Sequence, residues 1–211
     1  EANADLDVKN IKATNVTVLN ESKRSGGLIS RIIKGTGTVT IEDVDFQGFV
    51  ASGNRTSNTG GILGTSQSTA TSITRAIVDY IAEGTVTLSD GSITYKSERY
   101  TGGFLGNNNN TIGIDIVDSF YTGTLFETSG YIGAAVGREK LTTTTLTNTF
   151  YSNVLFNTTY TAPTSTTGIH ATLVNATSMP NLAWWNNFST VYYSANGLWT
   201  QDVTGRLILN R

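Results

Sequence analysis

The feature that most constrains the fold of this 211-residue chain is a short pattern, small-small-apolar-apolar-small, that recurs along it. Four copies are clear and a fifth is degenerate; they occupy residues 26–30, 60–64, 102–106, 133–137 and 167–171. Successive copies start about 34, 42, 31 and 34 residues apart, within the interval of ~20–50 residues that is typical of solenoids and other repeat arrays. The repeat therefore predicts a chain built from stacked copies of one small unit.

The third copy, in the stretch TGGFLGNNNN at 101–110, has the glycine content of a phosphate-binding loop but not its spacing. Neither G-x-G-x-x-G nor a glycine loop ending in Gly-Lys-Ser/Thr is present. We interpret the copy as a short strand in which one of Phe104 and Leu105 faces the core, while the other faces outward or a covering loop. The four asparagines at 107–110 are expected to form an exposed turn, because Asn tolerates positive φ.

A second landmark precedes each later copy: an apolar or aromatic stretch, then a Gly or Asn, then another short apolar stretch. Gly and Asn adopt positive φ most readily, so their exchange at one position indicates a fixed backbone turn. In the first copy this residue comes two positions early. The predicted turn residues are Gly48, Gly84, Gly123 and Asn153.

Short apolar runs bounded by Gly and Asn are typical of strands, and three strands per ~35 residues is what one coil of a β-solenoid needs. We expect a single all-β domain over residues 1–211, a parallel β-solenoid of about five coils whose core forms by stacking. Its expected parts are an N-terminal strand or first coil at 1–25, repeat coils at 26–178 and an aromatic-rich C-terminal cap at 179–211.

Composition excludes several functions. A net charge of −2 and a pI near 5.4 offer no basic surface for nucleic acid or an anionic membrane. The absence of cysteine excludes disulfides, thiol catalysis and thiolate zinc sites. No apolar run approaches the ~20 residues of a membrane span. Because the chain starts at Glu1 rather than Met, we expect a processed or excised fragment of a larger protein.

Function is most easily placed in the loops between the landmarks, because loops can vary without disturbing a solenoid core. The segments at 51–59, 89–101 and 159–167 differ in length and charge. The C-terminal region also gathers all three Trp residues. A cap over the open solenoid end is the favoured interpretation, and a sugar-stacking platform is the alternative. The candidate ligand contacts are Trp184, Trp185, Tyr192, Tyr193 and Trp199.

Carboxylates are the main catalytic or metal-binding candidates, since some β-helix proteins cleave polysaccharides. Asp43 and Asp45 would share one face of a strand. Asp45, Asp79 and Asp118 recur at one position of the landmark, so stacked coils could line up a calcium site or a glycoside-cleaving groove. Hydrogen bonding to the adjacent turn is the favoured role for these three aspartates. No catalytic residue, metal or cofactor is assigned.

Three further patterns are weak. His170 is the single histidine, so a histidine-dependent triad or metal site has little basis. The threonine run at 142–149 suggests an ice-binding ladder, but comparable threonines are absent from 44–50 and 117–126. The N-x-S/T sequons only modestly exceed the chance expectation of about five. The possible glycosylation sites are Asn15, Asn20, Asn54, Asn109, Asn157, Asn175 and Asn187.

The stretches at 117–137, 59–64 and 101–106 together resemble the GLUG-type repeat of bacterial and protist surface proteins. The ending NFSTVYYSANGLWTQDVTGRLIL is similar to the Trp-containing segment that often closes such arrays. The resemblance implies a right-handed parallel β-helix within a secreted, adhesin-like surface protein, and it supplies no catalytic residues.

The sequence thus favours a non-catalytic extracellular or cell-surface module that binds a glycan or protein ligand, or acts as a rigid spacer. Two alternatives stay open. One is a subunit that assembles with further copies of itself into a filament or sheath. The other, less favoured, is a polysaccharide-cleaving enzyme, which would need paired acids in an open groove.

Overall fold

The structure, a computed structural model, describes most of the chain. The residues described are 5–21, 23–33, 35–53, 57–67, 69–88, 91–97, 99–127, 131–141, 143–158, 172–173 and 198–210. Across these residues the secondary structure is entirely β.

Three parallel sheets make up the body of the molecule. The long-strand sheet contains β1 (Leu6–Asn20), β4 (Thr38–Ser52), β7 (Ala70–Ile81), β12 (Ile114–Glu127), β15 (Thr144–Thr158) and β16 (Thr172–Leu173). The second sheet contains β2 (Arg24–Gly26), β5 (Asn58–Gly60), β10 (Tyr100–Gly102) and β13 (Tyr131–Gly133). The third contains β3 (Ile29–Ile32), β6 (Leu63–Ser66), β11 (Leu105–Asn108) and β14 (Val136–Glu139).

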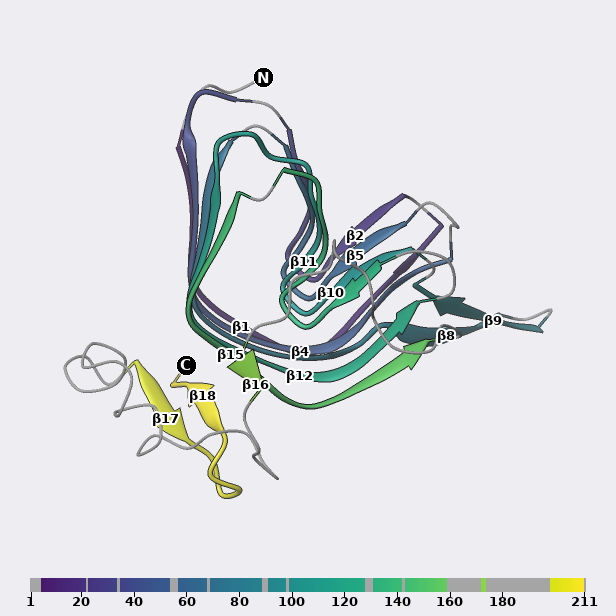
Figure 1. Ribbon diagram of the computed structural model, residues 1–211. Coiled ribbons are helices and arrows are strands. Elements are labelled where there is room, and N and C mark those ends of the chain that lie inside the picture. Colours follow the sequence, from purple (N-terminus) through teal and green to yellow (C-terminus); the bar gives the residue numbers. More distant parts are fainter. Residues whose placement is uncertain are drawn as a thin grey trace.

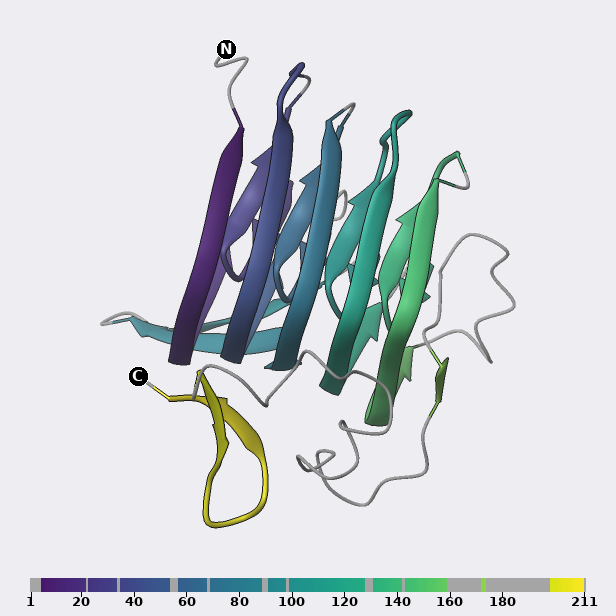
Figure 2. The ribbon, with the colours of Figure 1, turned by 90° about the vertical axis from the view of Figure 1, so that its left-hand side faces the viewer.

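Each sheet takes one strand from every coil, so the predicted parallel β-solenoid is confirmed. Figure 1 looks along the stack, and Figure 2 shows the long strands side by side in chain order. The described residues form four complete coils, the long strand of a fifth, β15, and beyond it the two-residue strand β16. The third coil carries an additional antiparallel hairpin, β8 (Glu83–Leu88) with β9 (Gly91–Lys96), which projects to the side (Figure 1).

The repeated glycine motif forms the sharp turn between the second and third sheets. The first glycines of the four copies are in register as Gly26, Gly60, Gly102 and Gly133. A Cβ on Gly102 would lie 2.1 Å from the carbonyl oxygen of Leu105 and 2.5 Å from the amide nitrogen of Gly137. The motif therefore recurs because two turns stack too closely there for a side chain.

The apolar pair inside the motif differs from its prediction. Phe104 and Leu105 are both fully buried in the core, although one was expected to face outward or a covering loop. Phe104 packs edge-on against Tyr121 of the long-strand sheet, and Leu105 stacks between Leu63 and Val136. Both are buried because the chain reverses at this point, so strand alternation does not extend across the pair.

The asparagine run is likewise not the exposed turn that we expected. Asn107, Asn108 and Asn110 are buried, and Asn109 is half-buried. Asn108 Nδ2 donates to Thr144 Oγ1 at 2.8 Å, and Asn110 Oδ1 accepts from the amide of Ile112 at 2.9 Å. These side chains satisfy backbone and hydroxyl groups at an inner corner of the coil, which explains their burial.

Each long strand bends at a residue with positive φ (Figure 1). These residues occupy equivalent positions in the five strands and form one column: Asn10, Asp43, Arg75, Asp118 and Asn148. Arg75 has the least suitable side chain for this conformation, but its guanidinium donates to Asp43 Oδ1 at 2.7 Å and Oδ2 at 2.8 Å. Asn148 similarly donates to Asp118 at 2.9 Å. Side chains along the column therefore stabilise the bend.

The predicted turn residues are only partly equivalent. Gly48 and Gly123 both pair with Tyr80, so they share one column. Asn153 lies at the extra residue of β15 where the register with β12 shifts, next to that column. Gly84 is wrong as a member of the set, because it lies in β8 and pairs with Tyr95 of the projecting hairpin. At Gly123, whose φ is +132°, a Cβ would lie 2.0 Å from the Tyr80 carbonyl oxygen.

The described part of the predicted cap forms a hairpin on the outer face of the long-strand sheet. Its strands are β17 (Trp199–Gln201) and β18 (Leu207–Leu209). Trp199, Leu207 and Leu209 pack on a column of outward-facing apolar side chains formed by Ile77, Phe120 and Phe150. The hairpin thus runs along the side of the solenoid (Figure 2).

Candidate functional site

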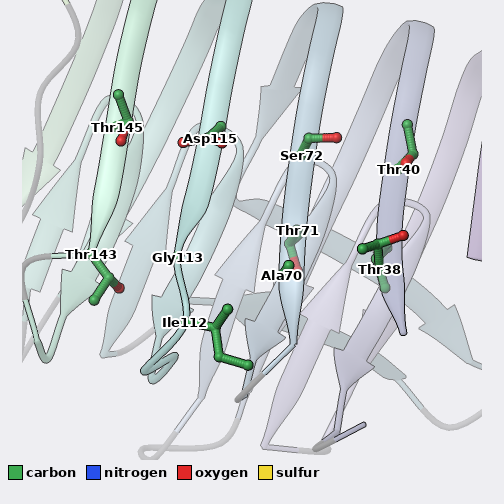
Figure 3. Close-up of a pocket in the computed structure, with 11 residues that line it drawn as sticks. Thr38, Thr40, Ala70, Thr71, Ser72, Ile112, Gly113, Asp115, Thr143 and Thr145 are labelled. Carbon is green, nitrogen blue, oxygen red and sulfur yellow. The ribbon is translucent and has the colours of Figure 1, made fainter. Parts of the chain in front are cut away.

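The candidate site is a groove of about 490 Å³ on the outer face of the long-strand sheet. It crosses the first halves of β4, β7, β12 and β15, before their bends (Figure 3). It is lined by Thr38, Val39, Thr40, Ala70, Thr71, Ser72, Ile112, Gly113, Asp115, Thr143 and Thr145.

Strand alternation and residue size produce the groove. Val39, Thr71 and Ile114 are in register, are buried and point inward, so the next residue of each strand faces outward. Those outward positions carry short side chains, which leave a shallow depression. Ile112, 59% exposed, stands at its margin (Figure 3).

One row of polar side chains runs across the floor of the groove. Thr40, Ser72, Asp115 and Thr145 are in register on four successive coils (Figure 3). Neighbouring strands in a sheet are ~4.8 Å apart, so the row presents hydroxyl, hydroxyl, carboxylate and hydroxyl groups at that interval. Within the described part of the chain, none of these four side chains has a hydrogen-bond partner in the protein.

Hydroxyls in the flanking positions are engaged with the protein. Thr38 Oγ1 and its amide both donate to Asp5 Oδ1, at 2.9 and 2.8 Å, which lowers the pKa of the Asp5 carboxyl. Thr71 Oγ1 donates to the carbonyl of Thr69 at 3.0 Å, and Thr143 Oγ1 to that of Asn110 at 3.1 Å. The groove therefore has fixed walls and a floor whose polar groups are available to a ligand.

The sequence prediction missed this row because it compared the wrong segments. Residues 144–146 of the threonine run are in register with 39–41, 71–73 and 114–116, segments that the sequence comparison did not use. A hydroxyl ladder therefore does extend across several coils, but Asp115 interrupts it. An ungapped threonine ladder of the kind suited to ice is absent from these rows.

The three aspartates expected to stack are separated. Asp45 is in register with Ile77, Asp79 with Gln47 and Thr122, and Asp118 with the column of bend residues. The expectation of an acid ladder is therefore wrong, because each of Asp79 and Asp118 is offset by two residues from Asp45. Of the three, only Asp118 lies at a bend: its φ is 47°, and its carboxylate accepts from Asn148 of the next coil.

Asp43 and Asp45 instead hold the C-terminal hairpin. Asp43 Oδ1 accepts from Trp199 Nε1 at 2.8 Å, and Asp43 also pairs with Arg75. Fully buried Asp45 pairs with the guanidinium of Arg206 at 2.7 Å and accepts from the amide of Leu209 at 3.3 Å.

Asp79 lies beside the Asp45–Arg206 pair and is half-buried. This burial raises the pKa of the Asp79 carboxyl above its usual value, Arg206 opposes the increase, and the charge of Asp45 adds to it. The Asp45–Arg206 pair thus forms a structural contact between hairpin and solenoid, and the charges of this pair act on Asp79.

The structure contradicts the prediction that Trp199 is an open ligand contact. It is only 5% exposed and its indole nitrogen is hydrogen-bonded to Asp43, so its ring cannot serve as an open stacking platform. The remaining four, Trp184, Trp185, Tyr192 and Tyr193, lie outside the described residues, as does His170.

Of the seven sequons, Asn15 is exposed on β1 and has φ of 58°, and Asn109 is half-buried. The side chains of the others, Asn20, Asn54, Asn157, Asn175 and Asn187, lie outside the description. The described residues contain no group of three His, Asp or Glu side chains arranged to hold a metal ion. In the same residues no helix is long and apolar enough to cross a membrane.

Comparison with known proteins gives one informative likeness, and it concerns the fold. No family model matches the chain, and no curated protein matches it. The chain is similar to the crystal structure of a Bacteroides ovatus protein provisionally named an immunoglobulin A1 protease. The TM-score is 0.66 at 15% identity, over 97% of this chain. The match spans 57% of the other protein's length. At this low identity the likeness shows a shared solenoid architecture.

Proposed function

We propose that this chain is a non-catalytic β-solenoid module of an extracellular or cell-surface protein, and that it binds a glycan in the groove across β4, β7, β12 and β15. The observation that carries the proposal is the row of Thr40, Ser72, Asp115 and Thr145. Its side chains face solvent and lack partners among the described residues.

The chemistry of the row suits a polyhydroxylated ligand. Hydroxyl groups both donate and accept hydrogen bonds, and the carboxylate of Asp115 accepts them from sugar hydroxyls. Because the row repeats at the strand spacing and crosses several coils, it favours an extended ligand over a compact one.

A non-catalytic role is supported by the engagement of the carboxylates that the sequence proposed for chemistry. Asp43 and Asp45 hold Arg75, Trp199 and Arg206. Asp115 stands alone as an acid in the groove lining, whereas glycoside cleavage generally needs two carboxyl groups about 5–10 Å apart. The resemblance to GLUG-type surface proteins is consistent with the proposed location.

A glycan-array screen followed by calorimetry on the best ligand tests this function. Ser72→Arg places a long side chain across the floor and should weaken binding by at least about tenfold, that is about 1.4 kcal/mol. Thr17→Arg, an exposed substitution on the second half of β1, is the matched control and should bind normally. Absence of any glycan ligand, or equal affinity of native protein and Ser72→Arg, would exclude the groove.

Self-assembly is a second candidate, favoured by the strand edges at the two ends of the stack. Within the described residues, β1 pairs only with β4, and β15 pairs on its outer side with only two residues of β16. Edges of this kind can continue their ladder into another copy in a head-to-tail arrangement.

A further inference from the structure

A second polar cluster lies on the far side of the coil from the groove, where the second and third sheets face each other beyond the glycine turn. Across this turn Asn58 Nδ2 of β5 donates to Thr65 Oγ1 of β6 at 2.8 Å. In the next coils the same strand positions carry Tyr100 and Asn107, and then Tyr131 and Arg138.

Two tyrosines and two arginines form a stack at this place. The Tyr100 and Tyr131 rings are stacked with their centroids 5.5 Å apart and an interplanar angle of 19°. The Cζ atoms of Arg99 and Arg138 lie 4.6 and 4.8 Å from the centroid of Tyr100. The coils are tied together here, because the amide of Tyr131 donates to the carbonyl of Arg99 at 2.7 Å.

The guanidinium groups of Arg99 and Arg138 have cation–π contacts but lack acceptors. Within the described chain, neither forms an ion pair or a side-chain hydrogen bond to the protein. By contrast, Arg75 and Arg206 each pair with carboxylates. A guanidinium lying on an aromatic ring keeps its N–H groups pointing outward from its edge, where they can form a two-pronged contact with an anion.

The four residues differ in solvent exposure, which indicates which of them supports the cluster and which can contact a ligand. Tyr100 is 5% exposed, so it serves as the rigid centre that positions both arginines. Arg99, Arg138 and Tyr131 are half-buried and can be reached from solvent. Partial burial of two unpaired cations also raises the gain from an anionic partner, since charges interact more strongly at lower effective dielectric.

We propose that Arg99, Arg138 and Tyr131 form a second binding site, which takes the carboxylate or sulfate group of an acidic glycan. The guanidinium groups bind the anionic group, and Tyr131 contacts the sugar ring beside it. An aromatic surface next to paired cations favours an acidic sugar over an acidic peptide, whose carboxylates lie on flexible aliphatic side chains. The site shares no residue with the groove, so the two can be tested separately.

The experiment is calorimetric titration of the native protein at low and moderate salt. The probes are oligogalacturonate, its methyl ester as the neutral match, a heparin-derived oligosaccharide and polyglutamate. We expect binding of oligogalacturonate or the heparin oligosaccharide. Stronger binding of oligogalacturonate would identify carboxylate as the preferred group, and stronger binding of the heparin oligosaccharide would identify sulfate. The methyl ester and polyglutamate should bind at least about tenfold more weakly.

Arg99→Gln and Arg138→Gln should each weaken binding of the acidic oligosaccharide about tenfold, as expected for loss of a charge-assisted contact. Arg31→Gln is the matched control, because Arg31 occupies the same register position of the third sheet as Arg138 but donates to Gln67. Arg138 lies within β14, whereas Arg99 lies outside the strands, just before β10. Arg99→Gln therefore still tests the site if Arg138→Gln impairs folding. The proposal is overturned if neither acidic oligosaccharide binds, if polyglutamate binds equally well, or if Arg31→Gln has the same effect as Arg99→Gln.

Discussion

At the scale of single residues, close backbone contact decides which positions must be glycine. Gly103 shows this clearly: a Cβ there would lie 2.1 Å from the carbonyl oxygen of Ala134 and 2.5 Å from the ring of Tyr121. Both obstacles are fixed, one as backbone and one as a fully buried ring. The glycine pattern in the sequence is therefore a record of tight stacking between coils.

Gly103→Ala should lower the free energy of unfolding by about 1–3 kcal/mol, because the added methyl overpacks a site that cannot relax. Chemical denaturation with urea measures the change. Ser30→Ala, at an exposed position of the same motif, is the control and should stay within about 0.5 kcal/mol of the native protein. A Gly103→Ala protein as stable as the control would contradict the stacking argument.

Asp79 leads to a prediction about pH. Its pKa is raised in the folded state by desolvation, so the folded protein binds a proton at a pH where the unfolded chain does not. Ionised Asp79 therefore costs stability at neutral pH, and the cost disappears as the pH falls through its folded pKa towards 3.8. Asp79→Asn should be more stable than the native protein at pH 7, with a gain that shrinks on acidification.

Urea unfolding of both proteins from pH 7 down to pH 4 checks this prediction, since the difference between them isolates Asp79. A gain that grows on acidification would have the wrong sign. Loss of stability at pH 7 would mean that the attraction between Asp79 and Arg206 outweighs desolvation.

At the scale of elements, the hairpin β17–β18 is held on the solenoid by polar contacts as well as by apolar packing. Arg206 and Trp199 reach buried carboxylates that lie more than 150 residues away in sequence. Strand periodicity could predict that Asp43 and Asp45 share a face, but not which segment covers that face. That decision depends on tertiary contacts.

Arg206→Met should destabilise the protein by about 3–5 kcal/mol, because it leaves the carboxylate of fully buried Asp45 without its cation. The double variant Asp45→Asn/Arg206→Met removes the charge as well and should recover much of the loss. Thermal and urea denaturation of the single and double variants form a double-mutant cycle. Equal destabilisation in both would show that packing of the hairpin, and not the ion pair, is responsible.

At the scale of the whole molecule, the solenoid is a short stack whose ends and sides have different chemistry. The sides carry the groove and the arginine–tyrosine cluster, whereas β1 offers a 15-residue edge. Leu6 of this strand is 45% exposed. The edge is suited to contact with another coil, either from the same protein or from a second copy.

If copies associate through this edge, sedimentation velocity should show growing, elongated species as concentration rises. Leu6→Lys should suppress them, because lysine on an edge strand disfavours strand addition. Val203→Lys, which changes an exposed apolar residue at the distant hairpin turn, is the control and should assemble like the native protein. A monomer at every concentration would exclude the self-assembly alternative.

The sequence by itself determined the class of fold and the place of its sharpest turns. Glycine repeats 31–42 residues apart, each accompanied by short strand patterns, indicate a stack of similar coils, and that inference needs no knowledge of which residues touch. Gly48 and Gly123 were predicted from the exchange of Gly and Asn at one position of the second landmark. In the structure a Cβ at either residue would meet the backbone of a neighbouring coil.

Only the tertiary structure decided which residues of successive coils stack in register. The β8–β9 hairpin projects from the coil, and the register shifts within the β1–β4 and β12–β15 pairs. Asp45 is in register with Ile77, two residues before Asp79. The row Thr40–Ser72–Asp115–Thr145 is likewise a property of register and not of any local motif. Short polar side chains are common in strands, and they become a candidate site only when four coils align them on one exposed face.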